Sequence, residues 1–266
     1  MHDRLTPVFH RLATLPQVRA IALAGSHATL SAGPASDYDL YVYTEDDIPA
    51  EVRRSMGLAF SPDAQIIDAW GPALAWTDPI SGVDFDTMFF GTRWIRDQIE
   101  KVMQHCEPSL GYSTCFLHTV RVSRILFDPS GWFGRLQHRA LQPYPNLLAQ
   151  RIIALNYPAL RDCHSSYRQQ LEKAATRGDV ISLNHRASAF LASVFDILFA
   201  LNKVAHPGEK RLLDLAQQLC PLRPPELRED ITALLQTAAT NPYGVVAAVD
   251  RLVDSLKALI DAHPSG

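Results

Sequence analysis

The sequence predicts an α+β protein in which a mixed α/β region with a small sheet is followed by a bundle of helices. In the first half of the chain, short apolar and aromatic runs typical of strands alternate with stretches of helical spacing. Beyond residue 146 only helical spacing remains. Prolines and an asparagine at 141–146 are typical of a linker between the two parts. We therefore expect two domains, over residues 1–140 and 146–266.

The first half of the chain begins with a predicted amphipathic helix. Thr6 and Pro7 suit its first positions, and apolar side chains follow at helical spacing up to Leu15. Small and turn-forming residues occupy 27–36. Apolar, aromatic and β-branched content predicts strands, and a renewed helical pattern predicts one further helix. The strands are expected over residues 18–24, 37–43, 65–70 and 82–90, and the helix over 94–103.

The second half of the chain is predicted to be a bundle of about five helices. Each segment carries apolar residues at helical spacing, which gives it one face to bury against its neighbours. The segments are residues 147–175, 183–203, 210–219, 226–239 and 242–262.

Composition and charge limit the classes of function. Hydrophobic residues make up 47% and charged residues 20% of the 266 residues, as in ordinary globular proteins. The net charge of −3 argues against a broad surface for nucleic acid but not against a local basic pocket. The most apolar stretch, residues 190–201, contains Asp196 and is too short to span a membrane.

The N-terminus and the cysteines predict a cytoplasmic location. The first residues lack the basic segment and apolar run of a secretory signal. Four cysteines are scattered along the chain without CxxC pairs, which favours reduced thiols over a disulfide framework or a zinc site.

Two aspartates, Asp37 and Asp39, lie two residues apart in a predicted strand and therefore point to the same face of the sheet. Their like charges repel each other unless a cation lies between them. Mg²⁺ prefers oxygen ligands of this kind and keeps positions open for phosphate oxygens. Alone, such a pair is most simply a feature of a sheet edge.

Gly25 and Ser26 follow the preceding apolar strand and are separated from Asp37 by ten residues. Glycine lets backbone N–H groups approach a phosphate closely, and the serine hydroxyl can donate as well. A Gly-Ser turn alone is also most simply structural. In combination with Asp37 and Asp39, it indicates metal-assisted transfer at a nucleoside triphosphate.

These residues resemble the signature of the DNA polymerase β-type nucleotidyltransferase superfamily. That signature is a hydrophobic residue, Gly, Gly or Ser, a spacer of about this length, and Asp-x-Asp or Asp-x-Glu. The resemblance implies an N-terminal nucleotidyltransferase domain and a mechanism with two Mg²⁺ ions. It implies that Asp37 and Asp39 are metal ligands and that Gly25 and Ser26 lie at the triphosphate. ATP is the expected co-substrate.

The resemblance also implies a third carboxylate on a later strand. Asp84 and Asp86 share one face of the strand over 82–90, so alternation does not choose between them. In related small-substrate enzymes, the last aspartate precedes a short apolar stretch and a helix bearing Trp-Ile. Asp86 matches this layout, with the segment 89–95 after it. We therefore favour Asp86 as the third metal ligand and as the general base for the substrate hydroxyl.

Four further segments resemble bacterial nucleotidyltransferases with a helical C-terminal domain. By analogy, Lys210 would contact the triphosphate as a point positive charge, although a solvated lysine at the start of a helix is an equal alternative. Asp196 lies among apolar residues, and we favour a structural role for it, as part of an internal ion pair, over a place in the cleft. The segments are residues 111–114, 125–128, 200–202 and 206–210.

The leading hypothesis is an enzyme that transfers a nucleoside monophosphate to a hydroxyl of a small molecule. An aminoglycoside-like or lincosamide-like acceptor is the narrower expectation. One alternative is AMP transfer to a protein, as by antitoxin-like relatives, although their domain is often minimal and this chain has a large helical half. Another is a catalytically inactive nucleotide-binding regulatory module, although no metal carboxylate is visibly missing.

Overall fold

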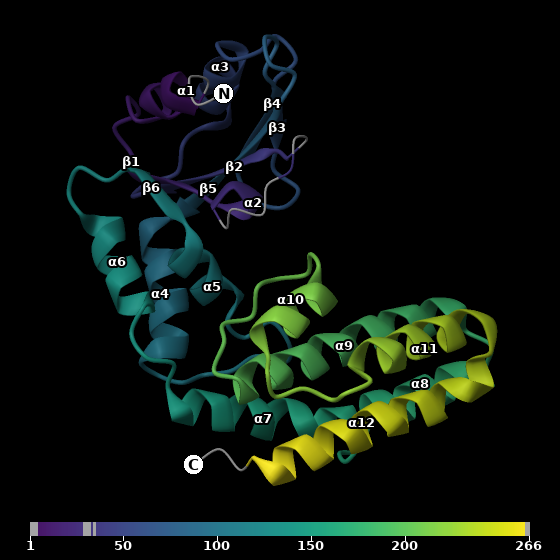
Figure 1. The fold of residues 1–266 in the computed structure, drawn as a ribbon. Helices are drawn as coiled ribbons and strands as arrows, with labels where there is room; N and C mark the ends of the chain where they lie inside the picture. The colour runs from purple at the N-terminus through teal and green to yellow at the C-terminus, as the bar shows by residue number, and fades with distance from the viewer. Residues whose placement is uncertain (1–4, 29–32, 34–35, 264–266) are drawn as a thin grey trace. The chain divides into compact units, whose positions relative to one another are not determined.

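The computed structural model describes residues 5–28, 33 and 36–263 (Figure 1). The chain forms two compact units, of which the first comprises Met1–Glu100 and Thr119–Gln142 and the second Lys101–His118 and Pro143–Gly266. The first unit contains a six-stranded sheet with helices, and the second is helical. The predicted α+β fold class is therefore confirmed. The assignment of residues 1–140 as a catalytic domain stays a prediction.

The sheet of the first unit has the strand order β3-β4-β5-β2-β1-β6. Its two middle strands, β5 and β2, are parallel, and all other neighbours are antiparallel. The strands are β1 (Val18–Leu23), β2 (Tyr38–Thr44), β3 (Gln65–Ile67), β4 (Ala73–Thr77), β5 (Asp84–Gly91) and β6 (Arg124–Phe127). The helices are α1 (Leu5–Leu12), α2 (Gly25–Ala28), α3 (Ala50–Leu58), α4 (Thr92–Met103), α5 (Cys115–Val122) and α6 (Trp132–Ala140).

One face of the sheet is apolar and packs against α1 and α3 (Figure 1). Leu40 and Val42 of β2 lie fully buried in this core with Leu12 of α1 and Met56 of α3. Successive residues of a strand point to opposite faces. The odd-numbered residues of β2, which include Asp39, therefore lie on the other face of the sheet.

Aromatic residues cover the carboxyl-terminal ends of β2 and β5 on that other face. The ring of Tyr43 stacks on Phe133 of α6 with a centroid distance of 4.7 Å, and Phe90 stacks on Trp94 of α4 at 5.5 Å. Tyr43 is completely buried. The aspartates of interest lie at the opposite, amino-terminal ends of the same two strands.

The second unit is organised around α9. Every residue from 193 to 201 in this helix is buried, as expected for a helix surrounded by others. The apolar stretch 190–201 is therefore part of the core of this unit. The helical elements from residue 146 onward are α7 (Asn146–Leu160), α8 (Tyr167–Thr176), α9 (Val180–Leu201), α10 (Leu212–Leu219), α11 (Leu227–Thr240), the 3-10 turn η1 (Pro242–Gly244) and α12 (Val245–Ala262).

The helix predicted over residues 147–175 is wrong, because the structure has two helices there, α7 and α8. Pro158 lies in the last turn of α7, and Ser165 has a left-handed backbone with φ of +59°. The hydroxyl of Ser166 then accepts a hydrogen bond from the backbone N–H of Gln169 and begins α8. Six α-helices, rather than about five, follow residue 146 within the described part of the chain.

Other boundaries also differ from the sequence-based expectation. The strand expected over 65–70 ends at residue 67, and α3, β4, α5, β6 and α6 were not predicted. Residues 25–28 form the short helix α2, while 29–32 and 34–35 of the predicted turn lie outside the described residues. Among the residues that the structure describes, no helix has the length and apolar character needed to cross a bilayer.

Candidate metal centre

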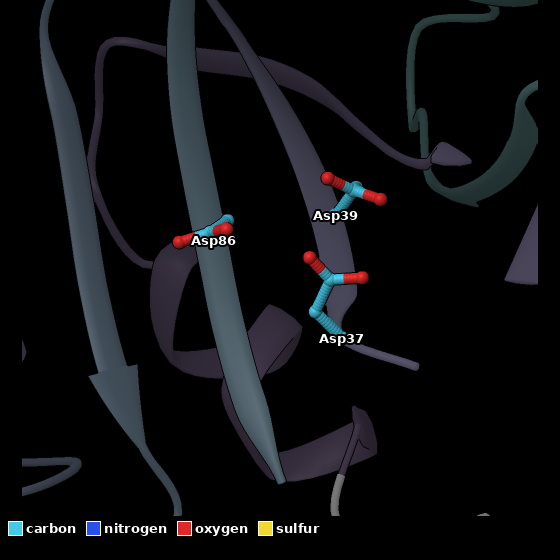
Figure 2. A group of neighbouring side chains, drawn as sticks. All are labelled: Asp37, Asp39 and Asp86. Atoms are coloured by element: carbon cyan, nitrogen blue, oxygen red, sulfur yellow. The ribbon is translucent and has the colours of Figure 1, made fainter. Parts of the chain in front are cut away.

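Asp37, Asp39 and Asp86 come together on the sheet (Figure 2). One carboxylate oxygen of each residue lies within 4.8 Å of those of the other two. Asp39 and Asp86 are direct partners in the parallel pair β2–β5, and Asp37 precedes β2 on the same face. Asp37 and Asp39 are half-buried, whereas Asp86 is exposed.

The spacing of these oxygens suits a hard divalent cation. Mg²⁺ binds oxygens at about 2.1 Å, so two oxygens on one ion are at most about 4.2 Å apart. The 4.8 Å limit of the three carboxylates is close to that value, and a small side-chain rotation would close the difference. Three negative charges at this distance repel one another, which a bound cation would relieve.

The structure places Asp86 with the other two aspartates, and Asp84 apart from them. Asp84 pairs with Thr77 of β4, whose hydroxyl donates a hydrogen bond of 2.6 Å to the Asp84 carboxylate. The sequence offered both residues on one strand face, and the parallel register of β2 and β5 decides between them. The catalytic role of Asp86 stays a prediction.

Gly25 lies directly against the carboxylate of Asp39. Its φ is +60°, and a Cβ atom built at this position would lie 1.7 Å from Oδ2 of Asp39. No side chain fits there without displacing that carboxylate. The neighbouring Ala24 N–H donates to the backbone oxygen of Asp39 at 2.9 Å, which fixes the end of β1 beside β2. Gly25 thus lies beside Asp39, and the place of Gly25 and Ser26 at a triphosphate stays a prediction.

His27 holds α2 against the sheet, a role that the sequence analysis did not identify. Its ring stacks on Tyr38 of β2 with a centroid distance of 4.3 Å, and Tyr38 stacks on Phe85 of β5 at 5.0 Å. Nε2 of His27 is 3.2 Å from the backbone oxygen of Ser36. The sequence position of His27, two residues after Gly25, does not predict its contacts with Tyr38 and Ser36. These contacts depend on how the chain returns to β2.

Tyr41 continues the face of the sheet that carries the aspartates. It is the second residue after Asp39 on β2, so both side chains point to the same side. Burial, together with the negative charge of Asp39, raises the pKa of Tyr41 to about 12. The phenol therefore stays protonated at neutral pH.

Asp196 is buried in the second unit, and the hydrogen bonds that hold it come from uncharged side chains and backbone rather than from the expected ion pair. Its carboxylate accepts hydrogen bonds from the backbone N–H of Ser113 at 3.0 Å and from the Ser113 hydroxyl at 2.6 Å. The side-chain amide of Asn156 donates to it at 3.4 Å. Burial raises the pKa of Asp196 to about 6, although these hydrogen bonds act in the opposite direction.

Two segments that the sequence analysis singled out, 111–114 and 206–210, are joined in the second unit. The hydroxyl of Thr114 accepts a hydrogen bond from the backbone N–H of His206 at 2.8 Å. Lys210 lies in the segment between α9 and α10 and is exposed. Its contact with a triphosphate stays a prediction.

A family model matches part of the chain. A model described as a domain of unknown function (DUF4037) matches residues 112–212. No curated protein matches the chain in sequence.

Two solved structures resemble the chain in fold over 97% of its length. A nucleotidyltransferase-like protein from Exiguobacterium sibiricum 255-15 is 11% identical, with 74% of its chain covered and a TM-score of 0.45. Spectinomycin adenyltransferase AAD(9) from Enterococcus faecialis, solved with ATP and spectinomycin, is 11% identical, with 99% of its chain covered and a TM-score of 0.35.

Proposed function

We propose that this chain transfers a nucleoside monophosphate from a nucleoside triphosphate to a hydroxyl of a small molecule. The observation that carries the proposal is the juxtaposition of Asp37, Asp39 and Asp86 beside Gly25. The hydroxyl oxygen would attack the α-phosphorus, and the bond from that phosphorus to the bridging oxygen would break. Pyrophosphate would be the leaving group. Among the nucleoside triphosphates, ATP is the first to test.

Each residue near the carboxylates has a role in this proposal. Asp37 and Asp39 would hold Mg²⁺, and Asp86 would hold Mg²⁺ and accept the proton of the attacking hydroxyl. When bound, two Mg²⁺ ions lower the pKa of that hydroxyl and neutralise charge on the leaving pyrophosphate. Gly25 leaves room for the backbone to approach the phosphates, with Ser26 as a further donor.

Lys210 of the second unit would add a positive charge to the triphosphate in the same proposal. Its exposure leaves the ammonium group accessible to a ligand.

Charge and the size of the second unit support a small molecule as the acceptor. A net charge of −3 does not favour a nucleic-acid acceptor, and the second unit is large enough to serve as a dedicated acceptor domain. Aminoglycosides and lincosamides are the first compounds to test. AMP transfer to a protein, and nucleotide binding without transfer, are the competing functions.

A pyrophosphate-release screen tests the proposal. Purified protein is incubated with Mg²⁺, each of the four nucleoside triphosphates, and a panel of hydroxylated small molecules, and the acceptor is weighed by mass spectrometry. We expect pyrophosphate release that depends on one acceptor class, which gains the mass of one nucleoside monophosphate. If a protein gained this mass instead, the result would support AMP transfer to a protein. Nucleotide binding without release of pyrophosphate would support the regulatory function.

A further inference from the structure

The second unit contains a cavity of about 590 Å³, lined by residues of α9, α10 and α11. Small-molecule sites in proteins commonly have volumes of about 300–1,000 Å³ and are mostly apolar with a few placed polar groups. The apolar walls of this cavity are formed by Leu191, Phe195, Leu212, Ile231 and Leu235. In size and in wall chemistry, the cavity therefore suits a small organic molecule.

His206 also lines this cavity and is completely buried. Its Nδ1 accepts a hydrogen bond from the backbone N–H of Gly208 at 3.1 Å, and the thiol of Cys115 lies 3.4 Å from the same atom. Nδ1 is therefore the acceptor nitrogen, and the proton of the neutral ring is on Nε2. Burial lowers the pKa of His206 to about 4, so the ring is neutral at physiological pH.

The Nε2–H group of His206 has no hydrogen-bond partner among the residues that the structure describes. A buried donor left without a partner costs on the order of 1–3 kcal/mol. The rings of Tyr112 and Phe199, each with its centroid 5.0 Å from that of the imidazole, hold the histidine in place. Nε2 is itself inaccessible to solvent, so the histidine adds an uncharged wall to the cavity rather than an accessible donor.

The charged residues among the lining residues cancel one another. They are Glu209, Arg211, Asp214 and Arg228, two of each sign. Asp214 lies between the two arginines, 2.7 Å from Arg228 and 3.7 Å from Arg211. These charges therefore give no net preference for an anionic or a cationic ligand. The apolar walls offer few partners to a ligand with many polar groups.

We propose that this cavity binds an uncharged, largely apolar small molecule. The proposal concerns residues of the second unit only, and it holds whether or not the chain transfers nucleotides.

Nile red is a suitable probe, because it is uncharged and largely apolar. Its emission moves to the blue and gains intensity when it leaves water for an apolar site. The full chain is titrated with the dye, and the dissociation constant is taken from the emission. We expect saturable binding to the wild-type chain.

Two tryptophan variants locate the bound dye. Ser188 lines the cavity and is exposed on α9, so Ser188→Trp narrows the cavity without entering the core. Ala239 is an exposed small residue of α11 that does not line the cavity, and Ala239→Trp is the matched control. We expect Ser188→Trp to weaken dye binding at least tenfold and Ala239→Trp to leave it unchanged. Absence of saturable binding, or equal affinity in the two variants, would overturn the proposal.

Discussion

Gly25 combines a left-handed backbone, which disfavours a side chain, with a neighbouring carboxylate, which leaves no room for one. Gly25→Ala should therefore displace the Asp39 carboxylate, in addition to about 1 kcal/mol or more of backbone strain. Gly82→Ala is the matched control, because Gly82 has φ of +68° and no atom within 4 Å of a Cβ built there. We expect Gly25→Ala to lose at least 100-fold in transfer rate and Gly82→Ala to keep its activity. Equal activity in the two variants would remove Gly25 from the site.

Asp84 and Asp86 give a second matched pair, two residues apart on β5. Asp86→Ala should depress the chemical step severely while nucleotide binding partly survives, because Asp37 and Asp39 remain to hold a metal ion. The Asp84 carboxylate accepts a hydrogen bond from Thr77 instead, so Asp84→Ala should lower the rate of the chemical step much less. Single-turnover rates of both variants check this. A larger loss for Asp84→Ala would show that the base is Asp84.

The repulsion between the three carboxylates predicts an unusual effect on stability. At 4.8 Å, two unit charges repel by between about 1 and 3 kcal/mol, depending on how far water screens them. Asp37→Asn and Asp39→Asn each remove one charge, so without metal each variant should melt at the same or a higher temperature than the wild type. Thermal melts in EDTA measure this. A clear decrease in melting temperature for both variants would contradict the assumed repulsion.

The sequence revealed Asp37 and Asp39 because strand alternation relates neighbours in the chain. Asp86 could be preferred over Asp84 only by resemblance, since the register between β2 and β5 is a long-range property. The contact of Gly25 with Asp39 likewise appears only once β1 and β2 are paired.

Among the elements, α3 shows why a pattern of apolar residues can miss a helix. Arg53 lies on its buried side and is only 5% exposed. Its guanidinium forms an ion pair with Asp68 at 2.8 Å and donates hydrogen bonds to the backbone oxygens of Ile48 and Ala73. A charged residue at a buried position interrupts the apolar spacing on which the prediction of a helix depends.

β4 and β6 were missed for a different reason, since both are short. β4 contains two alanines, which are depleted in strands, and it follows Pro72. It forms because β3 and β5 pair with it on both sides. β6 has four residues and, among the described strands, pairs with β1 alone at the edge of the sheet. Pairing partners distant in sequence, rather than local preference, decide both strands.

The network that joins α9 to the segment before α5 predicts a dependence of stability on pH. Asp196 has a folded-state pKa of about 6, above its ordinary value of 3.8. Its contribution to stability is therefore present below about pH 4 and is lost as the pH rises to about 6, by on the order of 3 kcal/mol. Relative to the wild type, Asp196→Asn should thus gain stability between pH 4 and pH 7. Urea unfolding of both proteins at several pH values checks this, and a constant or falling difference would contradict it.

Over the whole chain, the order of a mixed α/β part and a helical part was predictable because each part has its own residue pattern. Alternating and aromatic runs end before residue 146, and α9 has the apolar character of a core helix. The number of helices was not predictable, because the break between α7 and α8 rests on Ser165 and Ser166 rather than on a change in apolar spacing.

The central claim is that Asp37 and Asp39 hold the Mg²⁺ that binds the triphosphate. Calorimetric titration with an ATP analogue that carries a methylene group between the α- and β-phosphorus tests it without turnover. The proposal predicts that the wild-type chain and the Asp84→Asn control bind the analogue with Mg²⁺ at least tenfold more tightly than in EDTA. Asp37→Asn and Asp39→Asn should lose that difference. Equal affinity of all four proteins, with and without Mg²⁺, would contradict the claim.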